Sequence, residues 1–147
     1  MPHLPLMSRD EVVALLEHEF PQLRYDGRTI HIEEVGPLTS RLRMDYHERH
    51  LRPGGTLSGP AMMGLADFAL YVAVLANVGP EPLAVTTSLA FNFLRKPAPK
   101  DLVAECRLMK LGRRLAVGEI LLRSVGEADL VCHATGTYSI PAAKRGP

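Results

Sequence analysis

The residue with the clearest chemical potential is an acid within a run of apolar residues. Asp67 stands in the sequence Gly-Leu-Ala-Asp-Phe-Ala-Leu, and Met63 and Tyr71 lie one helical turn away on the same face. A buried carboxylate without a partner is costly or becomes protonated, so Asp67 needs a hydrogen-bonding partner or a task. A bond to a neighbouring loop or across a subunit interface would satisfy it structurally. General-base chemistry is the functional alternative.

The loop before this acid has the residues of an oxyanion-binding site. Residues 54–60 read Gly-Gly-Thr-Leu-Ser-Gly-Pro, and Ser58 is typical of a helix N-cap. Free N–H groups at a helix start point toward negative charge, such as the charge that a thioester carbonyl gains during hydrolysis. Pro60 has no N–H, so we expect the amide of Gly59 to be the donor, with the Ser58 hydroxyl as an auxiliary. Turn formation alone would also explain these glycines and prolines.

A helix must carry both features. The segment 61–77, AMMGLADFALYVAVLAN, is apolar on nearly every face and predicts a helix that is buried on all sides. Gly79 and Pro80 end it. A second, shorter helix is predicted over about 8–20, because Ser8 and Glu11 form a capping box.

The other apolar segments predict strands. Residues 29–44 form a strand-like stretch that Gly36-Pro37 interrupts, and residues 50–60 read as a loop. Short separators between the later strands predict antiparallel neighbours joined by hairpins. These later strands are expected at about 84–94, 102–111, 114–125 and 129–140.

A sheet with one apolar face can wrap around a wholly buried helix and hide the apolar surface of both. The pattern therefore predicts an α+β hotdog fold, an antiparallel β-sheet around one long central helix with a short N-terminal helix, although pattern alone leaves other α+β arrangements open. We expect a single domain over 1–147, with its core at about 28–141.

Composition excludes several classes of protein. With 46% hydrophobic residues, 22% charged residues and a net charge of +1, the chain lacks the basic character of nucleic-acid-binding proteins. The N-terminus has no signal-peptide pattern, and the apolar stretch 61–76 is shorter than the roughly 20 residues that span a bilayer, so we expect a cytoplasmic protein without membrane attachment. No histidine or cysteine has metal-site spacing, and Cys106 and Cys132 are expected to be reduced and packed.

Taken in order, these segments resemble the PaaI-type hotdog thioesterases, a family named after the phenylacetate pathway. The resemblance covers about residues 37–141. In that family a His-Gly-Gly loop precedes the central helix, which carries an acid in a Leu-Ala-Asp-like triplet; here the loop reads Ser58-Gly59-Pro60 and the triplet is Leu65-Ala66-Asp67. The segments 92–98, 111–116 and 131–138 are similar to the strand with a Pro-Ala turn, the basic hairpin and the closing strand of the family.

The resemblance implies hydrolysis of an acyl-CoA thioester. Asp67 would act as general base or nucleophile, the Gly59 N–H would polarise the thioester carbonyl, and Thr87 stands where the family has a hydroxyl that helps hold the attacking water. In the family the acid of one subunit faces the glycine loop of its partner. The resemblance therefore implies a homodimer with shared sites, a homotetramer of dimers, and no cofactor besides the coenzyme A of the substrate.

Basic residues are expected to bind the substrate's phosphates. Arg95, Lys96 and Lys100 crowd one turn, and Arg113 and Arg114 crowd another, although such clusters are also common as solvated turn charges. Met63 is expected to line part of the acyl pocket.

Three departures from the family pattern leave substrate positioning open. Ser58 replaces the family histidine, and Pro60 replaces its second glycine. Arg52 stands where the family has an asparagine, and the nearby His50 could fill the role of that asparagine. A non-catalytic acyl-CoA binding protein is therefore the alternative. A hotdog dehydratase is disfavoured, because no histidine occurs between His50 and His133.

Overall fold

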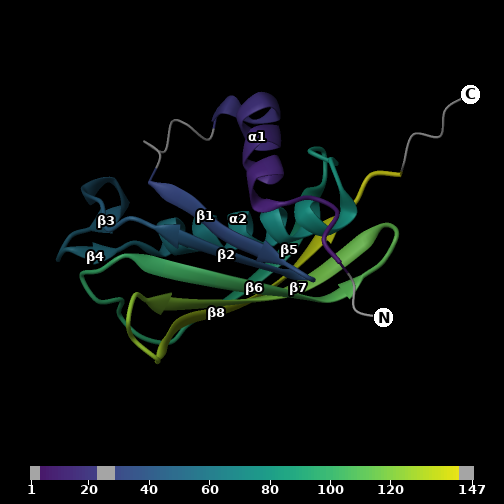
Figure 1. Cartoon of the computed structure of the whole chain (residues 1–147). Coiled ribbons are helices and arrows are strands. Elements are labelled where there is room, and N and C mark those ends of the chain that lie inside the picture. The colour runs from purple at the N-terminus through teal and green to yellow at the C-terminus, as the bar shows by residue number, and fades with distance from the viewer. Residues whose placement is uncertain (1–3, 23–28, 143–147) are drawn as a thin grey trace, which may run out of the picture.

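A curved antiparallel sheet encloses one helix in this structure. The computed structural model describes residues 4–22 and 29–142. Six strands form the sheet in the order β1-β2-β6-β7-β8-β5, with α2 inside its curve and α1 packed outside (Figure 1). The elements are α1 (Arg9–Glu19), β1 (Ile30–Gly36), β2 (Thr39–Met44), the 3-10 helix η2 (Glu48–His50), β3 (Leu51–Arg52), β4 (Thr56–Leu57), α2 (Gly59–Val78), β5 (Val85–Phe93), β6 (Leu102–Leu111), β7 (Leu115–Ser124) and β8 (Leu130–Ser139).

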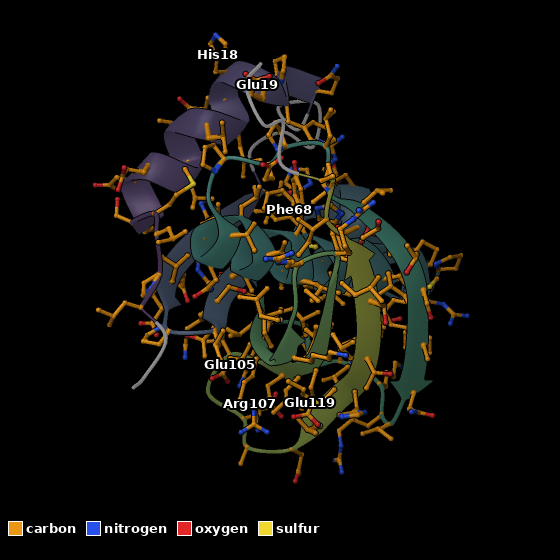
Figure 2. All side chains as sticks on the ribbon, turned by 90° about the vertical axis from the view of Figure 1, so that its right-hand side faces the viewer. His18, Glu19, Phe68, Glu105, Arg107 and Glu119 are labelled. Carbon is orange, nitrogen blue, oxygen red and sulfur yellow. The ribbon has the colours of Figure 1, made fainter. Side chains whose placement is uncertain are left out.

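Alternation along the strands creates the core. The register places Leu42, Ala104, Leu122 and Cys132 side by side across four strands, and all four side chains are buried against α2. Although Val103, Val117 and Leu121 are apolar, many of the intervening residues are polar or charged. Figure 2 shows three of them, Glu105, Arg107 and Glu119, on the side of the sheet away from α2. One apolar and one polar face is the pattern of an antiparallel sheet that covers a single helix.

A pair of glycines lets α2 approach the sheet closely. Gly118 in β7 and Gly136 in β8 are direct cross-strand partners. A Cβ atom added at Gly118 would lie 2.6 Å from Leu70 Cδ1, and one added at Gly136 would lie 2.8 Å from Leu70 Cδ2. The absence of side chains at these two positions therefore creates the space that Leu70 fills.

The predicted elements are confirmed to within two residues at nearly every boundary. The capping box of Ser8 and Glu11 is formed, with the Ser8 N–H donating to Glu11 Oε1 at 3.0 Å. Both cysteines are buried and unbridged, as expected. Burial raises the pKa of the Cys106 thiol to about 12, so this thiol is unreactive at neutral pH.

Strand order differs from the expectation in one place. A hairpin between β5 and β6 was expected from their short separator, and this expectation is wrong: β5 pairs with β8 at one edge, and β6 pairs with β2. The connection over 94–101 is long enough to cross between the two positions. The segment 50–60, expected to be only a loop, also contains the short β3–β4 ladder, in which Leu51 pairs with Leu57.

Burial of α2 is also less complete than expected. Its C-terminal half, from Ala69 to Asn77, is buried throughout, but Pro60 and Gly64 are exposed in the N-terminal half. The sheet encloses one side of this half and leaves the other side open in the single chain. By length and composition α2 could also cross a membrane, and 67% of its most apolar window is buried inside the fold, as in the core helix of a globular domain.

Candidate active site

Asp67 accepts two hydroxyl hydrogen bonds. Thr86 Oγ1 donates to Asp67 Oδ1 at 2.6 Å, and the Tyr138 hydroxyl donates to the same oxygen at 3.0 Å. Asp67 is half-buried on α2 and lines a cavity. Burial is the main cause that raises the pKa of Tyr138, so the phenol keeps its proton at neutral pH and is a hydrogen-bond donor.

The sheet register brings these two donors together. Thr86 on β5 is the direct cross-strand partner of Tyr138 on β8, and the register then shifts between Thr86 and Ser88. Such a bulge changes the direction in which neighbouring side chains point. Thr87, the residue that the family resemblance assigns to the site, is exposed, and its hydroxyl donates to the Thr137 carbonyl at 3.2 Å.

Three aromatic rings connect α1 with the carboxylate. Tyr138 is stacked on Tyr71, with ring centroids 5.8 Å apart and an angle of 23° between the rings. Phe20, at the end of α1, meets Tyr71 edge-on with centroids 6.5 Å apart. The Tyr71 hydroxyl donates to the Pro82 carbonyl at 2.7 Å, which fixes the middle ring.

A cavity of about 310 Å³ opens beside Asp67. This volume is at the lower end of the range for small-molecule sites. Most of its lining is apolar, and Figure 2 labels one lining residue, Phe68 of α2. Asp67, Tyr138 and His50 supply its main polar side chains, whereas Met63, also expected to contribute, is half-buried and outside the described lining.

The N-terminus of α2 is capped by Ser58 and follows a glycine turn. The Ser58 hydroxyl oxygen accepts from the Ala61 N–H at 3.2 Å and so caps the helix. Gly59 is the first helical residue, a position whose N–H has no intrahelical acceptor, and Pro60 has no N–H. The turn before it contains Gly54 at φ 99° and Gly55 at φ 79°, conformations that favour glycine.

Residues around the loop lie at different distances from the cavity. His50 lines the cavity, and its Nε2 is 2.7 Å from the hydroxyl of buried Thr29. Arg52 is exposed on β3. Among the other described histidines, His31 pairs with Asp45 and His133 with Glu119, both away from the cavity.

The proposed amide donor and the acid are far apart within one chain. Gly59 and Asp67 are eight residues apart on the same helix, which corresponds to about 12 Å along the axis. A single carbonyl group therefore cannot contact both residues of one chain.

The two clusters of basic residues also lie far apart within one chain. Arg95 and Lys96 are exposed before the start of β6, and Arg113 and Arg114 are exposed in the hairpin after its end. Because β6 has 10 residues, the clusters lie about 30 Å apart in one chain. Arg95 Nη1 is 3.4 Å from Asp129, an exposed ion pair.

Thr86 and Tyr138 are the site residues that sequence reasoning missed. The alternation of Ala134, Gly136 and Tyr138 in the last strand was a usable signal, because it places the tyrosine on the face toward the helix. The bulge that turns Thr86 inward has no comparable signal.

The chain is similar to known proteins over most of its length. The sequence model of the Thioesterase superfamily matches residues 54–131, from the glycine loop to the start of β8. A candidate esterase from Saccharolobus solfataricus is 30% identical over 136 residues, which are 92% of this chain and 87% of that protein.

Solved structures show the same architecture. A candidate thioesterase from Silicibacter sp. TM1040 has 45% sequence identity and a TM-score of 0.85, with 96% of each chain covered. The E. coli PaaI protein from the phenylacetic acid degradation operon has 18% identity and a TM-score of 0.76, with 91% of this chain and 94% of that chain covered. At this lower identity the likeness is one of fold.

Proposed function

Because the chain belongs to the thioesterase superfamily, we propose that it hydrolyses an acyl-CoA thioester to the free acid and coenzyme A, with Asp67 as the catalytic carboxylate. The resemblance to PaaI-type proteins and the hotdog fold are both confirmed. The observation that carries the proposal is the Asp67 carboxylate, which two hydroxyl groups hold beside an apolar cavity.

Two routes through Asp67 lead to the same products. As a general base, the carboxylate removes a proton from water, the water oxygen attacks the thioester carbon, and the C–S bond breaks to release the thiolate. As a nucleophile, the carboxylate attacks the same carbon, the C–S bond breaks to release the thiolate, and the resulting anhydride is then hydrolysed by water. In both routes the carbonyl oxygen gains negative charge that an N–H donor must stabilise.

A second copy of the chain would supply that donor. Residues 59 and 67 are too far apart for one chain to complete the site, but a two-fold axis near Met63 and Gly64, midway between them, would place each Gly59 amide beside the other chain's Asp67. The exposed side of Gly64 supports this packing, because no atom lies within 4 Å of a Cβ built there. Ser58 would add its hydroxyl to this donor site.

The sheet edge favours the same dimer. Within residues 4–22 and 29–142, β5 has one strand neighbour, β8, and its other edge carries unpaired backbone groups. Val85 and Phe93 are exposed to 55% and 50%, so an apolar surface accompanies this edge. Pairing of β5 with β5 of a second copy would cover both, and we propose this homodimer, with a homotetramer as a pair of such dimers.

The dimer would also unite the basic clusters. A two-fold axis that brings Gly59 to the partner's acid reverses the second sheet, so Arg95 and Lys96 of one chain would lie at the same end as Arg113 and Arg114 of the other. We propose that these residues contact the phosphates of coenzyme A. His50 and Arg52, beside the loop, and Met63, near the axis, are proposed to contact the rest of the substrate.

The proposed chemistry uses no metal ion or redox cofactor, because carboxylate, amide and water supply every proton and electron pair. We infer that the protein works in the cytoplasm, without a nucleic-acid or membrane partner.

A panel of acyl-CoA substrates tests the proposal. Release of free thiol is measured for the wild type and for Asp67→Asn, which removes the carboxylate charge but keeps its shape. We expect a loss of about 100-fold or more in kcat. Asp10→Asn, an exposed acid on α1, is the matched control. Undiminished turnover by Asp67→Asn would refute the assignment, and binding of acyl-CoA without thiol release by the wild type would favour the non-catalytic binding protein.

A further inference from the structure

The two hydroxyl donors at Asp67 bind the same carboxylate oxygen. From this geometry we propose that Tyr138 is a positioning residue: with Thr86 it fixes Oδ1 of Asp67 and leaves Oδ2 as the oxygen that reacts. The inference rests on the proposed hydrolysis and goes beyond it, because it assigns different tasks to the two oxygens of one carboxylate.

The hydrogen-bond distances distinguish the two oxygens of the Asp67 carboxylate. Oδ1 accepts from Thr86 at 2.6 Å and from Tyr138 at 3.0 Å, which uses both of its lone pairs. Within the described residues, neither donor forms a hydrogen bond with Oδ2. Oδ2 therefore has lone pairs available for water or for a thioester carbon, as a base or nucleophile needs.

Tyr138 is held more firmly than a typical hydroxyl donor. The residue is 4% exposed and its ring is stacked on Tyr71, and Phe20 and the Pro82 carbonyl hold Tyr71 in turn. Its backbone lies in β8, which has strand neighbours on both sides. A group locked by packing on a rigid element holds its partner within the narrow angle that catalysis requires. Thr86, in contrast, lies on edge strand β5.

This arrangement orients the carboxylate about its Cβ–Cγ bond. An aspartate without such donors can exchange its two oxygens by rotation, because this terminal torsion is broad. With Oδ1 fixed by two donors, Oδ2 has one position relative to the thioester carbon. Loss of either donor should therefore reduce the rate of the chemical step more than the binding of substrate.

Steady-state kinetics of Tyr138→Phe test the proposal. The variant keeps the stacked ring and removes only the hydroxyl, and we expect kcat to fall about 10-fold or more while KM changes less than about threefold. Thr135→Val removes a hydroxyl from the outer face of the same strand and is the matched control. Unchanged kcat in Tyr138→Phe, with Asp67→Asn inactive, would overturn the positioning role and leave the proposed hydrolysis intact.

Thr86 variants separate positioning from general stability. Thr86→Ser keeps the donor and is expected to retain most of kcat, whereas Thr86→Val is expected to lose it. Because both donors act on one oxygen, the losses in Tyr138→Phe and Thr86→Val should not be additive in the double variant. Full additivity would contradict a shared task.

Crystal structures give a readout that does not depend on turnover. We expect one Asp67 rotamer in the wild type, with both donors on the same oxygen, and a carboxylate in more than one orientation in Tyr138→Phe. A single unchanged orientation in the variant would overturn the inference, even if the protein hydrolysed no substrate in the panel.

Discussion

Asp67 differs from a structural buried acid in the kind of partners it has. A carboxylate paired with a guanidinium forms an ion pair that limits its chemistry, whereas the partners of Asp67 are the neutral hydroxyls of Thr86 and Tyr138. Neutral donors stabilise the position of the charge without cancelling it. This difference separates an acid that can react from one that only joins two elements.

The amide of Gly59 can be removed by a single substitution. Gly59→Pro deletes the N–H, and proline is well tolerated at the first position of a helix. The extended backbone of Ser58, with ψ of 157°, also suits a residue before proline. We expect kcat to fall about 100-fold or more, as for loss of an oxyanion donor.

Gly59→Ala is the matched variant, because it keeps the N–H. Its added Cβ would meet only Phe93 Cζ at 3.9 Å, an ordinary contact. Thiol-release kinetics of the two variants should therefore differ widely. Equal losses of kcat in the two variants would show that the added side-chain atoms at residue 59, rather than the missing N–H, reduce activity.

We expect low pH to reduce the contribution that Glu119, on the outer face of the sheet, makes to the stability of the fold. The hydrogen bond from His133 is the main cause that holds the pKa of Glu119 below its ordinary value of 4.5. A depressed folded-state pKa contributes stability that is present above about pH 4.5 and is lost as the pH falls through the folded-state value. Glu119→Gln should therefore be less stable than the wild type at pH 7, by about 0.2–1 kcal/mol for a pair near the surface.

Urea unfolding at pH 7 and at pH 3 measures this contribution. The difference between wild type and Glu119→Gln should shrink at the lower pH, because the pH falls toward the lowered pKa of the wild-type carboxyl. A difference that is as large at pH 3 as at pH 7 would contradict the origin assigned to it.

The site was only partly predictable at the scale of residues. Asp67 stands out because its charge conflicts with its apolar neighbours, and Ser58 and Gly59 follow from helix-start chemistry. The hydroxyl next to Asp67 belongs to Thr86 rather than Thr87 because a bulge shifts the register by one residue. Residue types alone do not determine such a shift, so the sequence could not distinguish the two threonines.

At the scale of elements, the contact between α2 and the sheet sets a narrow limit on side-chain size. A side chain at Gly136 would overlap Leu89 and Leu70, whose nearest atoms lie 2.4 and 2.8 Å from a Cβ built there, and it would approach the Ser88 carbonyl at 3.2 Å. Gly136→Val should therefore destabilise the fold by about 1–3 kcal/mol through overpacking. That loss corresponds to roughly 2–4 °C in Tm for each kcal/mol.

Thermal unfolding of a double variant tests the cause. Leu70→Ala removes one of the two side chains that the new side chain would overlap, Leu89 being the other, so its combination with Gly136→Val should cost less than the sum of the two single changes. Additive losses would place the strain elsewhere, for example at the backbone of β5.

Elements were more predictable than their arrangement. Hydrophobic period and the Gly and Pro positions defined both helices and the six long strands, because burial of a face imposes its period on the sequence. Strand order is set by contacts between distant segments, and the eight-residue connection over 94–101 is compatible with either a neighbour or a crossover. The position of β5 at an edge beside β8 therefore had to come from the structure.

At the scale of the whole molecule, one chain lacks part of the proposed site. The 12 Å rise between Gly59 and Asp67, taken from about 1.5 Å per residue, separates donor from acid. The open side of Gly64 and the unpaired edge of β5 lie where a second copy would complete it. Catalysis and assembly are thus expected to depend on each other.

Activity of a mixed dimer tests this shared site most directly. Asp67→Asn and Gly59→Pro chains, each inactive alone, are coexpressed with different tags, and the heterodimer is isolated through both. One of its two sites then combines an intact Asp67 with an intact partner amide, so we expect about half of the wild-type thiol release per dimer. A heterodimer as inactive as its two parents would contradict a site shared between subunits.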